Sequence, residues 1–366
     1  MLESVEWGEF KLGDLFEVQT SKKRFDANKV NVLKNGVYPY VVRMGTSNGQ
    51  KGFIDEDSSF LNEGNTIAFG QDTATMFYQQ KPYFTGDKIK ILKPKESRFD
   101  KENAQFFIST MAKAFSSFSW GSSSFNVSII KSQILTLPVD NEKIDFDFME
   151  RFITELEAER ITELEAYLKA SGLKDYHLTL EEQKALEDFE SGRFAWCEFK
   201  FKDIFDQIKQ GRRLKKDDQL PGDIPFVMSG VTDTGVVNYI SNPIASFPRN
   251  SITVDIFGNA FYRSYDYGAG DDTGAYWSKS KNYSREMMLF FTSSINQALM
   301  NKFDYGNKLR SSQSLNLKMK LPSQNNQPDL SSMETLISAV QKLVIKDVVE
   351  YADKKIAAHE QAAKVS

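Results

Sequence analysis

The sequence of 366 residues has very little of the side-chain chemistry that most enzymes use. It contains one cysteine, Cys197, and two histidines, His177 and His359. This count excludes a disulfide framework and any zinc site built from cysteine and histidine. A lone cysteine is typical of a reducing compartment. His177 stands between Tyr176 and Leu178 and is interpreted as a packed or exposed ring rather than a catalytic base.

The motifs of nucleotide-binding and hydrolytic enzymes are missing as well. There is no G-x-x-x-x-G-K-[ST] segment and no H-E-x-x-H segment. Asn242-Pro243-Ile244 does not match the Asn-Pro-Pro-aromatic segment of adenine methyltransferases. Asp271-Asp272 follows Gly268-Ala269-Gly270 at the place where a dinucleotide needs its phosphates, and is expected to serve a turn or a cap. We therefore predict no catalytic residue, no metal site and no cofactor in this chain.

Long hydrophobic runs are absent too. No run of about 18 apolar residues occurs, and residues 1–10 have neither the basic nor the apolar region of a signal peptide. We expect a cytoplasmic protein without a membrane anchor. With 40% hydrophobic and 26% charged residues, the composition is that of a globular protein. The net charge of -4 does not exclude nucleic-acid binding, because binding depends on local fields.

What the sequence does contain is an internal duplication. Trp7, Glu9, Phe10, Lys11, Asp14 and Phe16 recur in the same order as Trp196, Glu198, Phe199, Lys200, Asp203 and Phe205. Later matches keep this order: Phe77-Tyr78 with Phe261-Tyr262, Gly86-Asp87 with Gly270-Asp271, and Leu137-Pro138 with Leu321-Pro322. A repeat of this length is a duplicated domain, because solenoid repeats span about 20 to 50 residues. Two similar modules imply two similar ligands, or one ligand with two similar halves.

Each copy divides into a globular module and a long helix. Short apolar runs between turn residues predict strands, and the apolar spacing in residues 104–118 and 287–299 predicts a helix, so the fold class is α+β. We predict five segments: a first module at residues 1–143, a long helix at 144–172, a connector at 173–193, a second module at 194–326 and a second long helix at 327–366.

Apolar stripes run along both long helices at spacings of three and four, which place each stripe on one side of its helix. Each helix could pack on its own module, or the two stripes could pack on each other. The second interpretation is favoured by the length of residues 145–170, which would form a rod of about 39 Å, longer than a module needs. The residues predicted to pack helix on helix are Met149, Phe152, Ile153, Leu156, Leu164, Tyr167, Met333, Leu336, Ile337, Val340, Val344, Val348 and Tyr351.

Basic and polar loop residues form the candidate site. Lys22-Lys23-Arg24 and the basic residues of 212–216 occupy the same place in the two copies and are suited to neutralising phosphates. Arg, Asn, Gln and Ser side chains in other loops can pair with base edges, although a plain solvated loop is the alternative for each. The candidate DNA-contacting residues are Lys22, Lys23, Arg24, Arg43, Ser47, Asn48, Gln71, Thr73, Ser122 and Ser123 in the first module, and Arg212, Arg213, Lys215, Lys216, Ser229, Thr232, Asn259, Arg263, Asn307, Lys308 and Arg310 in the second.

In their repeated order these motifs resemble the specificity subunit of type I restriction-modification systems. The resemblance rests on the opening segments Trp7 to Phe16 and Trp196 to Phe205, on the Phe-Tyr pairs, and on Leu-Pro leading into Met149-Glu150 and Met333-Glu334. It covers essentially the whole chain. It implies two target recognition domains separated by an antiparallel coiled coil, which read a bipartite double-stranded DNA site around an unread spacer. Because the loops of the two copies differ, the site should be asymmetric.

The resemblance also implies partners. Two methyltransferase subunits that methylate adenine, and a restriction endonuclease and translocase subunit, would join the chain; S-adenosylmethionine, ATP and Mg²⁺ would bind to them. One alternative is a type IIB-like system, whose partner combines cleavage and methylation in one polypeptide. Another is a bivalent adaptor for protein or carbohydrate, for which Tyr78 and Tyr262 are suitable aromatic residues.

Overall fold

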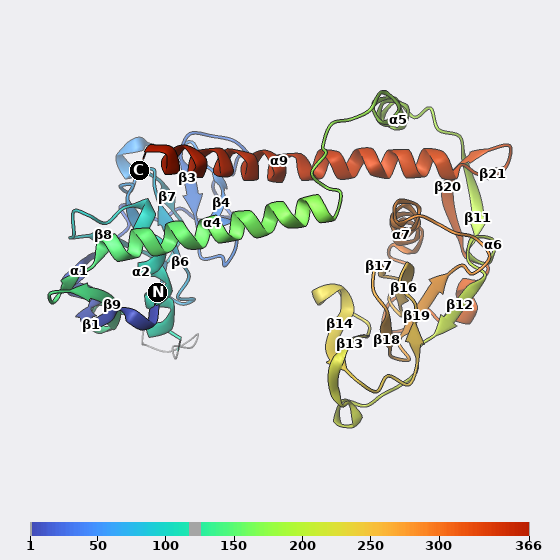
Figure 1. Cartoon of the computed structure of the whole chain (residues 1–366), viewed down its shortest axis with the longest axis horizontal. Helices are drawn as coiled ribbons and strands as arrows, with labels where there is room; N and C mark the ends of the chain where they lie inside the picture. The colour runs from blue at the N-terminus through green and yellow to red at the C-terminus, as the bar shows by residue number, and fades with distance from the viewer. Residues whose placement is uncertain (1, 117–125, 366) are drawn as a thin grey trace. The chain divides into compact units, whose positions relative to one another are not determined.

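The computed structural model describes residues 2–116 and 126–365, and its elements are labelled in Figure 1. The chain divides into two compact units, residues 1–163 with 358–366 and residues 164–357. The first module therefore belongs to the first unit and the second module to the second unit. None of the helices in the described part of the chain is long and apolar enough to cross a membrane.

The described residues of the first module form three small sheets. Its elements in chain order are η1 (Leu2–Ser4), β1 (Glu6–Lys11), α1 (Leu12–Leu15), β2 (Phe16–Thr20), β3 (Pro39–Val41), η2 (Ser47–Gly49), β4 (Gln50–Phe53), η3 (Ser58–Phe60), β5 (Thr66–Gly70), β6 (Met76–Gln79), β7 (Phe84–Thr85), β8 (Ile89–Pro94), α2 (Lys101–Ala114), α3 (Val127–Ser132), β9 (Ile134–Asp140) and β10 (Lys143–Ile144). Strands β2-β8-β5-β6 form an antiparallel sheet. Strands β4-β3-β7 form a second sheet, with β3 and β7 parallel, and β1-β9-β10 form the third.

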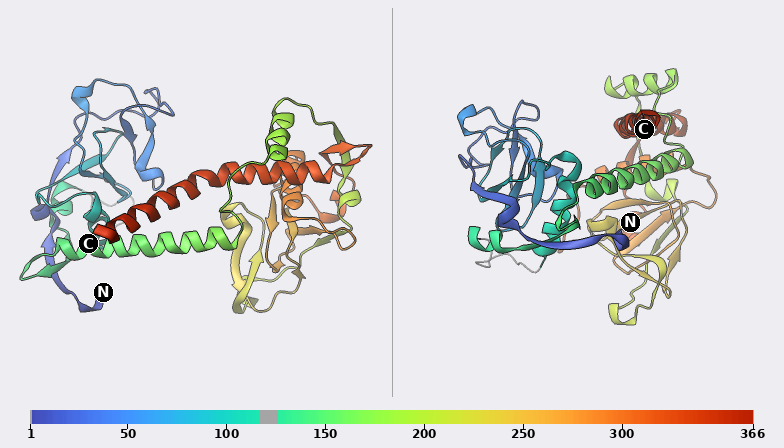
Figure 2. Two further views of the ribbon diagram at one scale, coloured as in Figure 1. Left: turned by 45° about the horizontal axis from the view of Figure 1, so that its top comes forward. Right: turned by 60° about the vertical axis from the view of Figure 1, so that its left-hand side comes forward.

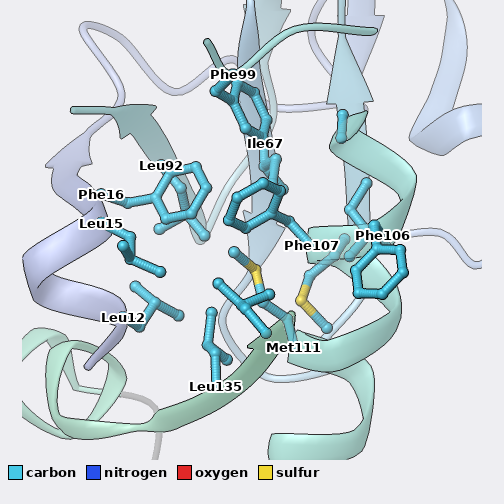
Figure 3. Close-up of a cluster of buried hydrophobic side chains, with 14 of the residues drawn as sticks. Leu12, Leu15, Phe16, Ile67, Leu92, Phe99, Phe106, Phe107, Met111 and Leu135 are labelled. Carbon is cyan, nitrogen blue, oxygen red and sulfur yellow. The ribbon is translucent and has the colours of Figure 1, made fainter. Parts of the chain in front are cut away.

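The core of the first module lies between α1, α2 and the β2-β8-β5-β6 sheet (Figure 3). Helix α2 is capped by Asp100, whose carboxylate accepts the backbone N–H of Glu102 at 3.0 Å and so satisfies one of the free donors of the first turn. Its apolar side turns Phe107 and Met111 into the core. Burial of each such side chain stabilises the fold by about 1.5–3 kcal/mol.

The second module repeats this plan. Its elements are β11 (Trp196–Lys200), α6 (Phe201–Ile204), β12 (Gln207–Gln210), η5 (Lys216–Asp218), β13 (Pro221–Val227), η6 (Thr232–Gly235), β14 (Val236–Ile240), β15 (Ser246–Phe247), β16 (Ser251–Asp255), β17 (Ala260–Arg263), β18 (Tyr267–Ala269), β19 (Thr273–Trp277), α7 (Arg285–Leu299), α8 (Ser311–Ser314), β20 (Lys318–Gln324) and β21 (Gln327–Pro328). The sheets are β12-β19-β16-β17, β14-β13-β18-β15 and β11-β20-β21. These strands run from yellow-green to red-orange in Figure 2.

The duplication extends to single side chains. Trp7 stacks on Phe106 with ring centroids 6.3 Å apart and an interplanar angle of 23°. In the second module Trp196 stacks on Phe290 at 6.4 Å and 25°. Each pair joins the opening strand of its module, β1 or β11, to the helix that covers the core, α2 or α7. The order of the strands and these matched contacts confirm two copies of one α+β module.

Two long helices and a connector complete the chain. Helix α4 (Phe146–Ala170) ends just before Gly172, which has a φ of +71°, a left-handed conformation that glycine adopts without steric cost. The connector contains α5 (Leu180–Glu190), which is capped by Thr179 and Glu182 as expected for a Thr followed three residues later by Glu. Helix α9 (Leu330–Val365) ends the described chain.

The predicted stripe of helix–helix contacts is partly wrong. Met149 is fully buried in the core of the first module, and Phe152 and Ile153 pack against the same core. Met333 and Leu336 lie in the core of the second module, with Ile337 packed against it. Spacing of three and four marks a buried side of a helix but does not identify what covers it, and here the first turns of each long helix close the adjacent module.

The remaining residues of the stripe divide between contact and solvent. Leu164 packs against a small cluster formed by Leu168 of α4 with Val349 and Ala352 of α9, and Ile345 packs there as well. The other residues assigned to helix packing are exposed, namely Leu156, Tyr167, Val340, Val344, Val348 and Tyr351. The contact between the two long helices therefore includes Leu164, as predicted. Its other members are Leu168, Ile345, Val349 and Ala352.

The connector is fastened to α9 by a buried carboxylate. Glu182 of α5 accepts hydrogen bonds from Ser338 Oγ at 2.6 Å and from Lys342 Nζ at 2.9 Å. Burial alone would raise the pKa of Glu182, but the hydrogen bonds from Ser338, the Thr179 N–H and Lys342 outweigh it and hold the pKa below its usual value. Lys174 adds an ion pair to Asp353. Within the second unit α5 is thus a fixed part of the structure.

Candidate nucleic-acid interface

The loop edge of the first module consists of residues 21–27, 42–48, 71–75 and 86–88, which follow strands β2, β3, β5 and β7. Backbone hydrogen bonds join these loops to one another: the Phe25 N–H donates to Thr85 O at 3.0 Å, and the Gly86 N–H donates to Val41 O at 2.8 Å. The Gln71 N–H donates to Lys88 O at 3.0 Å. Residues far apart in the sequence are therefore held together at one end of the module.

Charged side chains of this edge are paired across loops. Arg43 Nη1 lies 2.8 Å from Asp72 Oδ2, and Lys88 Nζ lies 2.6 Å from the same oxygen. Arg24 pairs with Asp87 at 3.1 Å. One carboxylate thus serves two cations, which leaves an excess of positive charge at the edge. A hollow of about 720 Å³ lies beside it, with Arg24, Arg43 and Thr73 in its lining.

The other candidates in the first module occupy different settings. Lys22 is exposed, and the ammonium of Lys23 lies over the rings of Phe25 and Phe60 at 4.7 and 4.3 Å. Ser47 and Asn48 are exposed on η2, and Asn48 Nδ2 donates to Tyr78 O at 3.2 Å. Ser122 and Ser123 lie outside the described residues.

The loop edge of the second module consists of residues 211–216, 228–235, 256–259, 270–272 and 304–310. Its loops are also joined by hydrogen bonds. The Arg212 N–H donates to Ala269 O at 2.9 Å, and the Gly230 N–H donates to Asp255 Oδ2 at 3.1 Å. Arg310 Nη1 donates to Asp271 O at 3.0 Å. The second module therefore gathers the equivalent loops at the equivalent end.

The chemistry of this second edge is different. Ser229, which takes the place of Arg43, donates through Oγ to Asp272 Oδ2 at 2.8 Å. Asp255 is buried and accepts the backbone N–H groups of Phe257 and Asn259, each at 2.9 Å. Asn259 Nδ2 donates to the same carboxylate, so this candidate side chain stabilises its own loop. Ser229 and Asp272 thus stand where the first edge carries Arg43 and Lys88.

Positive charge at the second edge is concentrated in residues 212–216. Arg212, Arg213, Lys215 and Lys216 are exposed. Their side chains form no hydrogen bond or ion pair with any residue that the structure describes. Such side chains are free to neutralise phosphates. Lys308 is placed differently, because its ammonium lies over the ring of Tyr305 at 4.2 Å, and Asn307 Nδ2 donates to Lys302 O. Thr232 is exposed at the start of η6.

Arg263 was predicted to contact bases, and the structure contradicts this. Its side chain is only 1% exposed and is enclosed by the module. The guanidinium donates to Thr253 Oγ1 at 3.0 Å, to Tyr265 Oη at 3.1 Å and to Thr234 O at 2.5 Å. An arginine in a strand can point to either face, and the sequence did not reveal which face is closed.

The acidic residues of both edges are the functional candidates that residue types alone missed. Asp72, Asp255 and Asp272 hold the loops and set their charge, and only the repeat of Gly86-Asp87 as Gly270-Asp271 signalled this region. A turn or capping role was expected for Asp271-Asp272, and Asp272 indeed accepts hydrogen bonds from Ser229 and Thr273. Among the described residues, no group of His, Cys, Asp and Glu side chains could hold a metal ion.

The aromatic residues considered for an adaptor role are held within their modules. Tyr78 Oη donates to Asn65 Oδ1 at 3.0 Å, and Tyr262 Oη donates to Asn250 Oδ1 at 3.2 Å. Burial raises the pKa of both hydroxyls. These matched contacts indicate a structural role that the two copies share.

Two loop edges on two copies of one scaffold define a recognition protein with two binding heads. The chain matches the model of the type I restriction modification DNA specificity domain twice, over residues 4–166 and 195–351. It therefore belongs to the family of type I restriction-modification DNA specificity domains. The resemblance carried by the sequence motifs is confirmed, and with it the broad role of a specificity subunit in DNA sequence recognition. An adaptor for protein or carbohydrate is not favoured.

Similar proteins agree with this assignment. The specificity subunit S.BcgI of the type II restriction enzyme BgcI from Heyndrickxia coagulans is 29% identical over 356 residues, which cover 94% of this chain and 98% of that protein. The crystal structure of a type I restriction-modification system S subunit from M. genitalium matches with a TM-score of 0.57 at 14% identity, over 99% of this chain and 95% of that one. The second likeness shows the shared fold.

Proposed function

We propose that this subunit recognises a bipartite, asymmetric double-stranded DNA site, with one half contacted by the loop edge of each module. The observation that carries the proposal is the pairing of a shared scaffold with different side chains. Arg43, Asp72 and Lys88 stand at the first edge, whereas Ser229 and Asp272 stand at the second. Two edges of different chemistry recognise different base pairs.

At the first edge Arg43 is the proposed base-reading residue. A guanidinium can form two hydrogen bonds to O6 and N7 of guanine in the major groove, the commonest specific contact to DNA. Asp72 accepts from Nη1 and thereby fixes the orientation of the group. The other N–H groups of Arg43 donate to no residue in the described part of the chain. They are available for a base.

At the second edge phosphate binding and base reading fall to different loops. The basic residues of 212–216 supply phosphate contacts, which give affinity without sequence preference. Ser229 and the exposed Thr232 can accept or donate at base edges, and the methyl group of Thr232 can contact the methyl of thymine. The spacer between the half-sites reflects the long helices, since the 25 residues of α4 correspond to about 37 Å, or one turn of B-DNA.

The partners follow from the same proposal. The subunit directs two adenine methyltransferase subunits and an endonuclease and translocase subunit to the site. S-adenosylmethionine, ATP and Mg²⁺ bind to those partners. The chain itself contributes recognition, and this division of labour agrees with side chains at both loop edges that hold loops and present hydrogen-bonding groups.

One experiment tests the proposal directly. The chain is co-expressed with the methyltransferase encoded beside it, and the host DNA is sequenced for N6-methyladenine. We expect a single motif of two different half-sites separated by a fixed gap. The proposal is overturned if a stable complex produces no new methylation, or if the motif is one continuous block.

The complex from this co-expression also identifies the partners. The relative from Heyndrickxia coagulans is named as part of a type II restriction enzyme, so the experiment has to separate two arrangements. Purification of the complex with its partners and mass determination of each band would show separate modification and restriction polypeptides in a type I arrangement. One large polypeptide carrying both activities would indicate the type IIB-like alternative.

A further inference from the structure

Arg263 is a buried cation without an acidic partner. It lies in β17, and no ion pair joins it to any carboxylate that the structure describes. Its neighbours are the hydroxyls of Thr253, Thr234 and Tyr265, one backbone carbonyl, and the rings of Phe261 and Tyr267, whose centroids lie 5.6 and 6.0 Å from the guanidinium carbon. Burial of a charge is unfavourable unless hydrogen bonds satisfy it. The hydrogen bonds of Arg263 offset this cost, and they tie the guanidinium to the segments that carry its acceptors.

What Arg263 holds is the loop between β13 and β14. Nη1 donates to Thr234 Oγ1 at 3.0 Å and Nη2 donates to Thr234 O at 2.5 Å. Asp233 and Thr234 both have positive φ angles, 45° and 52°. Non-glycine residues rarely adopt this conformation, and a β-branched residue such as threonine almost never does. The two hydrogen bonds from Arg263 keep the backbone there.

The first module holds the matching loop in the same way with a different side chain. Gln79 is buried at the position in β6 that Arg263 occupies in β17. Its Nε2 donates to Asn48 O at 3.1 Å. Ser47 and Asn48 have positive φ angles of 53° and 54°, and a glycine follows each pair, Gly49 here and Gly235 in the second module. In both modules a buried side chain of a strand thus donates a hydrogen bond to a loop residue with a positive φ angle. The donor is Gln79 in the first module and Arg263 in the second.

We propose that Gln79 and Arg263 are positioning residues for DNA recognition, each setting the backbone of one reading loop without touching DNA. The proposal deepens the proposed function and rests on it. In the second module the fixed loop presents Val231, Thr232 and Asp233, all exposed. These side chains suit thymine methyl groups and the cytosine amino group in the major groove. In the first module the loop presents Thr46 and Ser47.

The direction of the effect follows from geometry. Hydrogen bonds to base edges need donor–acceptor distances near 2.7 to 3.2 Å, so a loop that samples several conformations loses discrimination before it loses general affinity for DNA. Contacts to phosphate from residues 212–216 do not depend on the hydrogen bonds between Arg263 and Thr234. Loss of Arg263 should therefore relax sequence choice in one half-site while leaving nonspecific binding intact.

The test uses the complex with the co-expressed methyltransferase and compares Arg263→Met with Gln79→Met. Methionine keeps an apolar chain of similar length and removes the donors. We expect each variant to make one half of the methylated motif degenerate, a different half for each, with the other half unchanged. For an oligonucleotide carrying the wild-type motif, the ratio of specific to nonspecific binding should fall by about 10- to 100-fold.

A second pair of variants separates positioning from stability. Arg263→Gln installs the donor that the first module uses and should restore part of the lost discrimination. Thr234→Gly leaves Arg263 in place, removes the hydroxyl that accepts from Nη1 and opens more backbone conformations to the loop, so it should relax the same half-site even if Arg263→Met fails to fold. Unfolding midpoints are measured for all variants alongside the motif.

The outcomes are distinct. A wild-type complex that yields no bipartite motif would remove the proposed function itself. A clear wild-type motif that stays unchanged in Thr234→Gly and in folded Arg263→Met would overturn only the positioning role. So would equal relaxation of both half-sites by either methionine variant, because that result indicates a general loss of structure.

Discussion

The two loop edges stand on equivalent strands of the two modules but differ in charge. At the first, Asp72 is shared by Arg43 and Lys88. At the second, Ser229 and Thr273 donate to Asp272. The four exposed cations of residues 212–216 stand on a separate loop, and their side chains pair with none of the described residues. The comparison shows how one scaffold carries two different loop edges: the strands, the core and the Trp–Phe stack stay constant, whereas the residues that follow the strands change.

The largest expected effect comes from lengthening the long helices α4 and α9, one of which follows each module. Inserting about seven residues, close to two helical turns, into both α4 and α9 should lengthen the gap between the half-sites. Methylation at the original motif should disappear and reappear at a motif with the same two halves farther apart. Sequencing of N6-methyladenine measures this. If the gap stays the same, the helices do not determine the spacing.

A smaller effect should separate the first edge from the second. Arg43→Ala removes the guanidinium that we assign to guanine, and discrimination at one base pair should fall by about 10- to 100-fold. Ser229→Ala is the matched change in the second module and should act on the other half-site with a weaker loss, since one neutral hydrogen bond is involved. Competition binding with single-base variants of the motif checks both, and an effect of both changes on one half-site would contradict the assignment.

The basic loops should show a difference in salt dependence. Arg212→Ala with Arg213→Ala should weaken binding to all sequences and make the negative slope of log K against log salt shallower by about two, because each lost phosphate contact contributes about 0.9. Lys22→Ala with Lys23→Ala should change the slope less, because Lys23 lies over Phe25 and Phe60. Titrations between low and moderate salt measure both slopes. An unchanged slope in the arginine variant would remove residues 212 and 213 from the interface.

The smallest effect concerns Glu182, whose carboxylate joins α5 to Ser338 and Lys342 of α9. Because the folded pKa of Glu182 is lowered, its stabilisation is present above the unfolded pKa of about 4.3 and is lost as pH falls through the folded value. Glu182→Gln should therefore reduce stability by about 1 kcal/mol at neutral pH, and the difference from wild type should shrink toward acid pH. Thermal unfolding as a function of pH measures it, with Glu181→Gln as the exposed control. A pH-independent difference would exclude the charge of Glu182 as the cause.

Sequence alone predicted what depends on local patterns. The end of α4 near Gly172 and the start of α5 at Thr179 follow from caps. The helix predicted over residues 104–118 is α2, which ends at Ala114, and residues 117–118 lie outside the described part. The partner of an apolar stripe does not follow, so Met149 and Met333 were assigned to the wrong contact. Arg263 could have been recognised as structural from its alignment with Gln79, since both follow a Phe-Tyr pair by one residue. The pairing of Arg43 with Asp72 needed the folded loops.

The buried donors in β6 and β17 also bear on how new specificities arise. Gln79 and Arg263 each donate a hydrogen bond to the backbone of a loop. The exposed side chains of such a loop can change without disturbing the core, because the core is formed by other residues of the module. Variation can then accumulate at positions such as 46–47 and 231–233 while folding is preserved. Under the proposed function, a library restricted to those positions is the place to select subunits for new DNA targets.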